Sequence, residues 1–141
     1  MSDGATAADL RVRREALGLT QGWVAAQVGV QDRAVRRWEA GDRAIPGGVW
    51  DLLDEGERRA EAILDAISEE LLRVKVDLDE EPEGLDVVVY DSDEELWAAH
   101  PLFAPWPASW HRAVCARARD LTDVPVRFHY GPTTGARQRR E

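Results

Sequence analysis

The sequence predicts a mainly α-helical protein, with an N-terminal five-helix domain followed by a small α/β domain. Three observations support this fold class. Apolar residues recur every three or four positions within residues 8–74, which is typical of helices that bury one face. β-Branched runs at residues 87–90 and 124–130 are typical of strands. An acidic stretch at residues 77–84, which contains proline and glycine, separates the two parts.

The first helix is predicted to begin near residue 8 and to end near residue 18. Leu10 and Leu17 lie seven positions apart, and therefore on the same face of this helix. Residues 1–7 are small and polar, so we expect them to be disordered.

Two short helices joined by a tight turn are predicted between residues 19 and 46. Thr20 is a favourable N-cap for the first of them, because its hydroxyl can accept a hydrogen bond from the first turn. Gly29 falls where this helix ends, since glycine adopts the left-handed conformation without a steric cost. The second helix fits residues 31–40. Together they form a helix-turn-helix arrangement, with inward-facing residues Val24, Ala25, Val28, Val35 and Trp38.

This region carries a set of residues at fixed spacing: Leu10, Arg11, Arg14, Gly18, Leu19, Thr20, Gln21, Ala25, Gly29, Val30, Val35, Arg37, Trp38, Glu39, Gly41, Arg43, Ile45 and Pro46. At these positions the sequence resembles the DNA-binding unit of Cro/CI-type (Xre-like) repressors. The resemblance extends over about residues 8–55. It implies a Cro/CI-like helix-turn-helix domain whose partner is double-stranded DNA.

In a helix-turn-helix, the second helix enters the major groove and its N-terminal residues contact base edges. The residues of this helix that are not needed for packing are therefore the candidates for base contacts. An arginine can bind guanine O6 and N7 with two hydrogen bonds, and an aspartate can accept one from cytosine. Asp32 can instead orient a neighbouring arginine. The predicted base-contacting residues are Asp32, Arg33, Arg36 and Arg37.

The DNA backbone is predicted to lie against the start of the first helix of the pair, where unpaired N–H groups favour an anion. The family resemblance places Gln21 against the backbone, and Arg43 lies in the loop after the recognition helix. Trp23 can rest on sugar and phosphate or pack on the protein, and the sequence leaves both open. Gly22 and Trp23 depart from the family, which usually has a charged residue there.

A fourth helix is predicted to follow Pro46, which suits a first helical turn. A fifth, longer helix fits residues 57–74, with one continuous apolar stripe. The stripe can pack on its own domain or form a helix–helix seam between two copies of the chain. Its residues are Ala60, Ile63, Leu64, Ile67, Leu71 and Val74.

The C-terminal part is predicted to have the order strand, helix, helix, strand. A buried strand fits residues 87–90, with an edge strand over residues 124–130. The elements between them are a short helix at 93–99, a packed loop at 102–108 and a helix at 109–121. Two strands alone form a marginal sheet, so we expect pairing across a two-fold axis. The candidate dimerisation residues are Ile63, Leu64, Ile67, Leu71, Val88 and Val126.

This layout of head, long helix and α/β tail is similar to that of YdiL-like proteins and of anti-CRISPR-associated autorepressors. The likeness implies a homodimer that binds an inverted repeat and represses its own operon. The expected organisation is a helix-turn-helix domain at 1–56, a long helix and acidic linker at 57–84, a small α/β dimerisation domain at 85–130, and a disordered tail at 131–141.

The net charge of −9 is distributed unevenly along the chain. Residues 1–50 carry seven Arg and six acids, or +1; residues 51–95 carry 18 acids and four bases, or −14; residues 96–141 carry seven Arg and three acids, or +4. The acidity therefore lies away from the predicted recognition helix. Because exposed charges are screened over about 8–10 Å, a local basic face can still bind DNA.

Other classes of function find little support in the sequence. No catalytic constellation or cofactor motif is present, so we do not expect an enzyme. His111 and Cys115 supply only two of the four ligands that structural zinc needs, so we predict no metal site. The chain has a single cysteine, which fits a reducing compartment. It has no apolar run long enough to span a membrane and no secretory signal. These features predict a cytoplasmic protein that is not in the membrane. The alternative to a repressor is an antitoxin or interaction module whose C-terminal half binds a partner protein.

Overall fold

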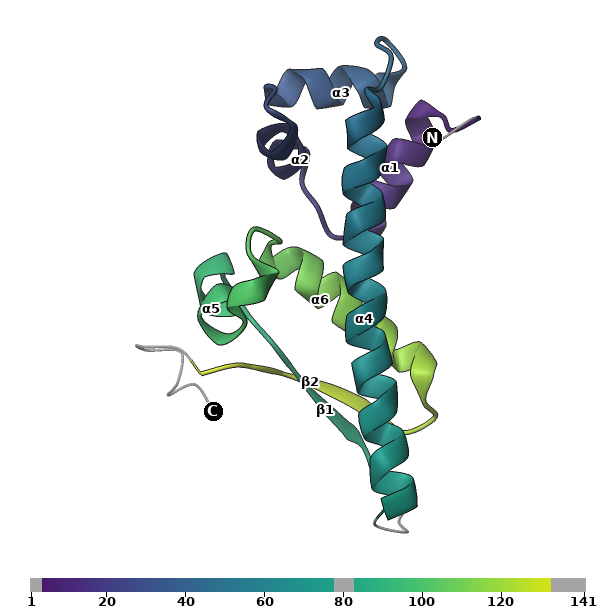
Figure 1. The fold of residues 1–141 in the computed structure, drawn as a ribbon, viewed down its shortest axis with the longest axis vertical. Helices are drawn as coiled ribbons and strands as arrows, with labels where there is room; N and C mark the ends of the chain where they lie inside the picture. The colour runs from purple at the N-terminus through teal and green to yellow at the C-terminus, as the bar shows by residue number, and fades with distance from the viewer. Residues whose placement is uncertain (1–3, 78–82, 133–141) are drawn as a thin grey trace. The chain divides into compact units, whose positions relative to one another are not determined.

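The computed structural model describes residues 4–77 and 83–132. They pack as two compact units that divide between residues 61 and 62. The elements in chain order (Figure 1) are α1 (Ala7–Ala16), α2 (Gln21–Val28), α3 (Asp32–Ala40), α4 (Gly47–Asp77), β1 (Leu85–Val89), α5 (Asp93–Ala99), the 3₁₀ helix η1 (Pro101–Phe103), α6 (Ala108–Ala116), the 3₁₀ helix η2 (Arg117–Leu121) and β2 (Val126–Tyr130).

Helix α1 begins earlier than the sequence analysis predicted, because Thr6 and Asp9 form a capping box. The Thr6 hydroxyl accepts from the Asp9 N–H at 3.1 Å, and the Thr6 N–H donates to the Asp9 carboxylate at 2.8 Å. The predicted disorder is therefore wrong for Thr6 and Ala7, while residues 1–3 lie outside the described residues. The Thr-x-x-Asp pattern was the available signal.

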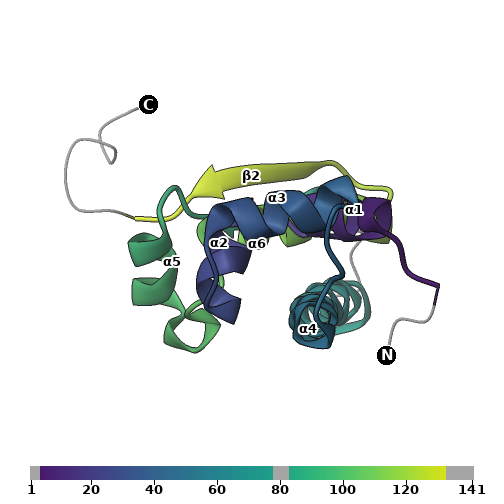
Figure 2. The same cartoon turned by 90° about the horizontal axis from the view of Figure 1, so that it is seen from above.

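The helix-turn-helix is confirmed in its local geometry. Thr20 caps α2, with its hydroxyl accepting from the Trp23 N–H at 2.9 Å. Gly29 ends α2 with φ 78°, and Gly41 ends α3 with φ 83°, in the left-handed region that favours glycine. Helices α2 and α3 cross at a steep angle in both views (Figures 1 and 2). The first unit buries Leu10, Leu17, Leu19, Val24, Ala25, Val35, Trp38, Val49, Trp50, Leu53 and Ala60.

The predicted fourth and fifth helices are one continuous helix, α4. Gly56 lies at the predicted break, but a single interior glycine costs only about 1 kcal/mol relative to alanine. Glu55 forms ion pairs with Arg58 and Arg59 one turn later, which supports the helix across this point. The prediction of five helices in the head was therefore wrong in number, because nothing between residues 53 and 57 ends the helix.

Strands β1 and β2 of the second unit pair with each other in parallel, in a register that runs from Leu85 opposite Val126 to Val89 opposite Tyr130. The predicted order of strand, helix, helix and strand is confirmed. The expectation of a buried first strand holds only in part: Val89 is buried, but the Val88 side chain is 44% exposed. Burial alternates along β1 because only one face of the sheet packs on the unit's own core.

Helices α5 and α6 form the core of the second unit. Ser92 caps α5, with its hydroxyl accepting from the Glu95 N–H at 3.2 Å. The predicted helix 109–121 is α6 followed by the tighter helix η2. The two helices bury Trp110, Val114 and Ala118. In the preceding loop Trp106 is buried and Phe103 is half-buried. The Trp106 and Trp110 rings lie 5.4 Å apart.

Candidate nucleic-acid interface

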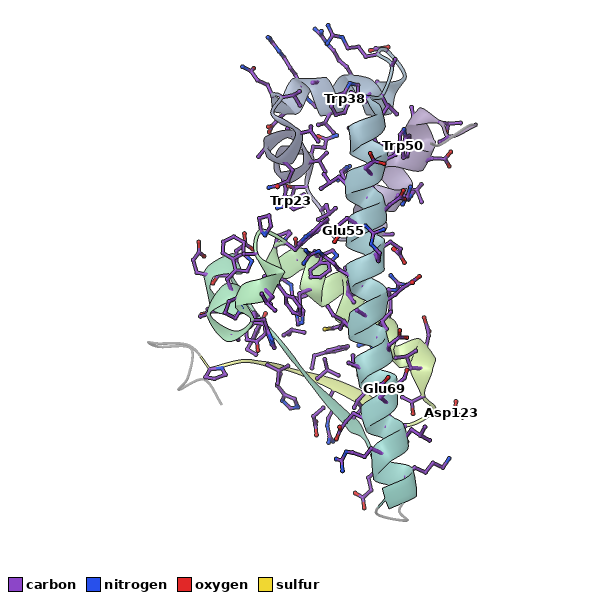
Figure 3. All side chains as sticks on the ribbon, in the orientation of Figure 1. Trp23, Trp38, Trp50, Glu55, Glu69 and Asp123 are labelled. Atoms are coloured by element: carbon purple, nitrogen blue, oxygen red, sulfur yellow. The ribbon has the colours of Figure 1, made fainter. Side chains whose placement is uncertain are left out.

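Helix α3 has one buried and one exposed face. Val35 and Trp38 are buried against the first unit, and Figure 3 shows Trp38 on the inner side of the helix. Nitrogen-tipped side chains project from the opposite side of α3 in the same figure. The residues that the structure places on the exposed face are Asp32, Arg33, Arg36, Arg37 and Ala40, with Arg43 exposed in the loop that follows.

A buried ion pair fixes α3 to the rest of the first unit. Arg14 of α1 donates to the Glu39 carboxylate through Nε at 2.6 Å and through Nη2 at 3.1 Å. Its third donor, Nη1, reaches the Leu19 carbonyl at 2.8 Å. The two side chains are only 10% and 5% exposed. A bidentate pair of this kind fixes orientation as well as distance, so the turn between α1 and α2 and the C-terminal half of α3 move together.

Gln21 extends this network to α2. Its side-chain N–H group donates to Glu39 Oε1 at 3.0 Å, so Glu39 holds partners from two other helices. Burial acts to raise the pKa of Glu39, but the hydrogen bonds from Arg14 and Gln21 outweigh it and leave that pKa lowered. Glu39 therefore stays ionised at neutral pH. Arg14 and Glu39 were part of the family pattern, but their pairing was missed because sequence spacing does not reveal that two charges meet inside the unit.

The predicted phosphate contacts occupy different environments. Gln21 is half-buried and already bonded to Glu39. Trp23 is half-buried at the start of α2 and appears in Figure 3. Arg43 is exposed. Of the three, Arg43 is the side chain that can reach a phosphate without giving up a recorded partner in the described residues.

The arginines of the recognition helix differ from the other arginines of the chain. Within residues 4–77 and 83–132, the side chains of Arg33, Arg36, Arg37 and Arg43 have no hydrogen bond, ion pair or ring contact. All other arginines in these ranges have a partner within the chain. They are Arg11, Arg13, Arg14, Arg58, Arg59, Arg73, Arg112, Arg117, Arg119 and Arg127. In an acidic protein, four adjacent unpaired guanidinium groups leave a positive surface available to an external anion.

Asp32 is the exposed acid of α3, and it lies over the start of α2. A Cβ added to Gly22 would come within 3.3 Å of its carboxylate oxygen Oδ2. Glycine at position 22 therefore leaves room for Asp32, which offers a physical reason for this departure from the family pattern. Among the described residues Asp32 has no recorded partner, so its alternative role of orienting an arginine is not seen in this structure.

The candidate dimerisation residues lie in the second unit. Ile63, Leu64, Ile67, Leu71 and Val126 are half-buried and Val88 is exposed. Ile63, Ile67 and Val88 line one groove together. Leu71 lines a separate recess beside Leu121 and Val124. The side chain of Val74, the last residue of the stripe, lies outside those described.

His111 and Cys115 are buried together in α6. Cys115 Sγ lies 3.6 Å from His111 Nε2. Burial, together with the nearby charges of His100 and Arg112, lowers the pKa of His111 to about 4. Burial raises the pKa of Cys115 to about 12. Within the part of the chain that the structure describes, no three His, Cys, Asp or Glu side chains are placed to hold a metal ion. In the same ranges, no helix is apolar enough over its length to cross a bilayer.

Residues 6–66 match the model of a family described as a helix-turn-helix domain. The match covers α1 to α3 and the first part of α4. It confirms a helix-turn-helix DNA-binding head and supports a DNA-binding regulator in general terms. No curated protein matches the chain.

Proposed function

We propose that the protein is a sequence-specific transcriptional repressor that binds an inverted repeat as a homodimer, with its own promoter as the first candidate target. The observation that carries this proposal is the set of unpaired arginines on α3. Arg33 and Arg37 are one helical turn apart, so both can enter the same stretch of major groove. Neither needs to break an internal ion pair before it binds DNA.

Each arginine of this pair can recognise guanine through O6 and N7, which is worth about 1–3 kcal/mol of discrimination. Arg36 lies on the same exposed face and can reach either a base or a phosphate. Asp32 complements them, because its carboxylate accepts from a cytosine amino group and repels a phosphate oxygen. An acid placed among arginines favours a defined base sequence over the uniform negative charge of the DNA backbone.

Phosphate binding is assigned to Arg43 and to the start of α2, where the helix dipole favours an anion although the Trp23 N–H is already taken by Thr20. Gln21 can join them only by sharing its amide with Glu39. Few phosphate contacts, in a chain of net charge −9, predict weak binding to random DNA. Specificity then depends on the base contacts of α3.

A homodimer follows from the size of one head. One recognition helix reads a half-site, and helix-turn-helix proteins combine two half-sites about one DNA turn apart through a two-fold axis. A dimer bound over a promoter blocks RNA polymerase without any catalytic chemistry. Light scattering on the full chain at micromolar concentration tests this step, and a monomeric mass would refute the homodimer.

Arg33→Ala is expected to weaken binding to the specific promoter site by about 5- to 150-fold, because one bidentate base contact is lost. Binding to random DNA of equal length should change much less. Fluorescence anisotropy with both DNAs at one salt concentration measures the two effects. Arg58→Ala is the matched control, since Arg58 is an exposed arginine of the same unit that pairs with Glu55.

Arg43→Ala should behave differently from Arg33→Ala. Loss of one phosphate contact lowers the affinity for both DNAs and reduces the slope of log affinity against log salt by about 1. If Arg33→Ala and Arg43→Ala gave the same proportional loss on specific and random DNA, the assignment of Arg33 to base reading would be wrong.

A further inference from the structure

One edge of β1 carries backbone groups that the sheet does not use. The Leu85 N–H donates to the Pro125 carbonyl at 2.8 Å, and the Val89 carbonyl accepts from the Gly131 N–H at 2.9 Å. In a parallel pair, alternate residues turn toward the partner strand. Leu85, Val87 and Val89 therefore face β2, while the N–H and C=O groups of Asp86 and Val88 point to the opposite edge.

The lining of an apolar groove of about 370 Å³ includes four consecutive residues of β1 and none of β2, which points to its lying at this edge. Residues 85–88 of β1 form one wall, and Ile63, Ala66 and Ile67 of α4 form the other. Glu70, His100, Phe103 and His111 complete its lining. All of these residues belong to the second unit. The groove thus combines unpaired strand groups with the apolar stripe of α4, which are the two features an incoming strand requires.

We propose that this groove receives β1 of a second copy of the chain, paired antiparallel to β1 in a register centred on Val87. The proposal rests on the homodimer proposed above and identifies its seam. The two β1 strands join two marginal two-stranded sheets into one sheet of four strands. Asp86 of each copy then exchanges two backbone hydrogen bonds with Val88 of the other, so one edge supplies both halves of the interface.

The neighbouring registers are less favourable for specific reasons. A register centred on Asp86 sets two carboxylates directly opposite each other, which is destabilising. A register centred on Val88 needs the Tyr90 carbonyl, which already accepts from Arg112 Nη1 at 2.5 Å. In the register centred on Val87, Asp86 and Val88 supply four hydrogen bonds between the two β1 strands without Tyr90, and each Asp86 lies opposite a valine instead of a second carboxylate.

Cysteine cross-linking in the full chain tests this register. Val87 pairs with itself at a non-hydrogen-bonded position, where Cα atoms lie about 4.5 Å apart, so Val87→Cys should form an intermolecular disulfide under mild oxidation. Val88→Cys alone should not, because two residues offset along antiparallel strands are separated by roughly 8 Å. Cys115 does not interfere, because it is buried and its thiol pKa is about 12.

A mixed sample provides a second measurement that does not alter the half-buried Val87. Asp86→Cys and Val88→Cys proteins, mixed and oxidised, should form a heterodimer through a hydrogen-bonded pair with Cα atoms about 5.5 Å apart, while neither variant cross-links alone. Non-reducing gels and intact mass read out both experiments.

The outcomes separate this seam from the homodimer itself. A dimeric mass without cross-linking in either experiment would overturn the β1 seam and leave the homodimer standing. Cross-linking of Val88→Cys alone, without the mixed pair, would replace the register by one centred on Val88. A monomeric mass would refute both the seam and the homodimer.

Discussion

Glu39→Ala is expected to destabilise the N-terminal unit by about 3–5 kcal/mol, because it leaves the buried Arg14 guanidinium without its anion. The total stability of a domain is only about 5–15 kcal/mol, so a large part of the helix-turn-helix population should unfold at modest denaturant. Urea unfolding followed by circular dichroism measures the change. Asp54→Ala is the matched control, because its ion pair with Arg13 is exposed and should contribute far less to stability.

The same ion pair predicts how the N-terminal unit responds to acid. The pKa of Glu39 is lower in the folded than in the unfolded chain, so its contribution to stability is present above the unfolded value of about 4.3. The contribution is lost as pH falls through the folded pKa. The ion pair should therefore stabilise the N-terminal unit at neutral pH and stop doing so in acid, once Glu39 is protonated in the folded chain. If Glu39→Ala cost no more stability than Asp54→Ala, the buried ion pair would not stabilise the N-terminal unit.

Lowering the pH from 7.5 to 4 is expected to destabilise the second unit by about 3 kcal/mol through His111. Its pKa is about 4 when folded, against 6.5 in the unfolded chain, a difference of about 2.5 at 1.36 kcal/mol per pH unit. Between these values the unfolded chain binds the proton and the folded chain does not. The contribution of His111 to the stability of the second unit is therefore fully present above pH 6.5 and decreases as the pH falls toward 4.

His111→Phe separates this titration from the packing role of the ring. His111 contacts the rings of Tyr90 and Phe103 at centroid distances of 5.7 Å, so an aromatic replacement keeps most of the buried area. Urea unfolding of wild type and variant at pH 7.5 and 4.5 gives the comparison. We expect the variant to lose much less stability between the two pH values. Equal losses in both proteins would place the titrating group elsewhere.

Much of the helix-turn-helix could be predicted because its signals are local. The helix ends are set by the Thr20 hydroxyl and by the glycines at 29 and 41, and the buried face of α3 is set by the spacing of Val35 and Trp38. Each of these signals lies within one or two helical turns of the feature that it determines. The exposure of Arg33 and Arg37 follows from the burial of those two residues on the same helix. Residue contacts with DNA stay predictions, as do the dimerisation residues.

The features that sequence reasoning missed depend on residues distant in the chain. Arg14 and Glu39 are 25 positions apart, and no periodicity predicts that they meet inside the unit. Parallel pairing of β1 with β2 depends on the packing of α5 and α6 between them. The joining of two predicted helices into α4 had a different cause: Gly56 weakens a helix but does not end it, because Glu55 is bonded across the break.

The parallel pairing also sets an order of folding events. Asp86 and Arg127, joined across the sheet, are 41 residues apart, whereas α1, α2 and α3 contact near neighbours in the chain. The chain must close this long loop, at a cost in entropy, before the strands can form hydrogen bonds. Strand pairing is therefore slower than the formation of local contacts between helices. During synthesis the helix-turn-helix can therefore fold first. The sheet, and with it the β1 edge proposed to join two copies, forms only once the chain has been made through residue 130.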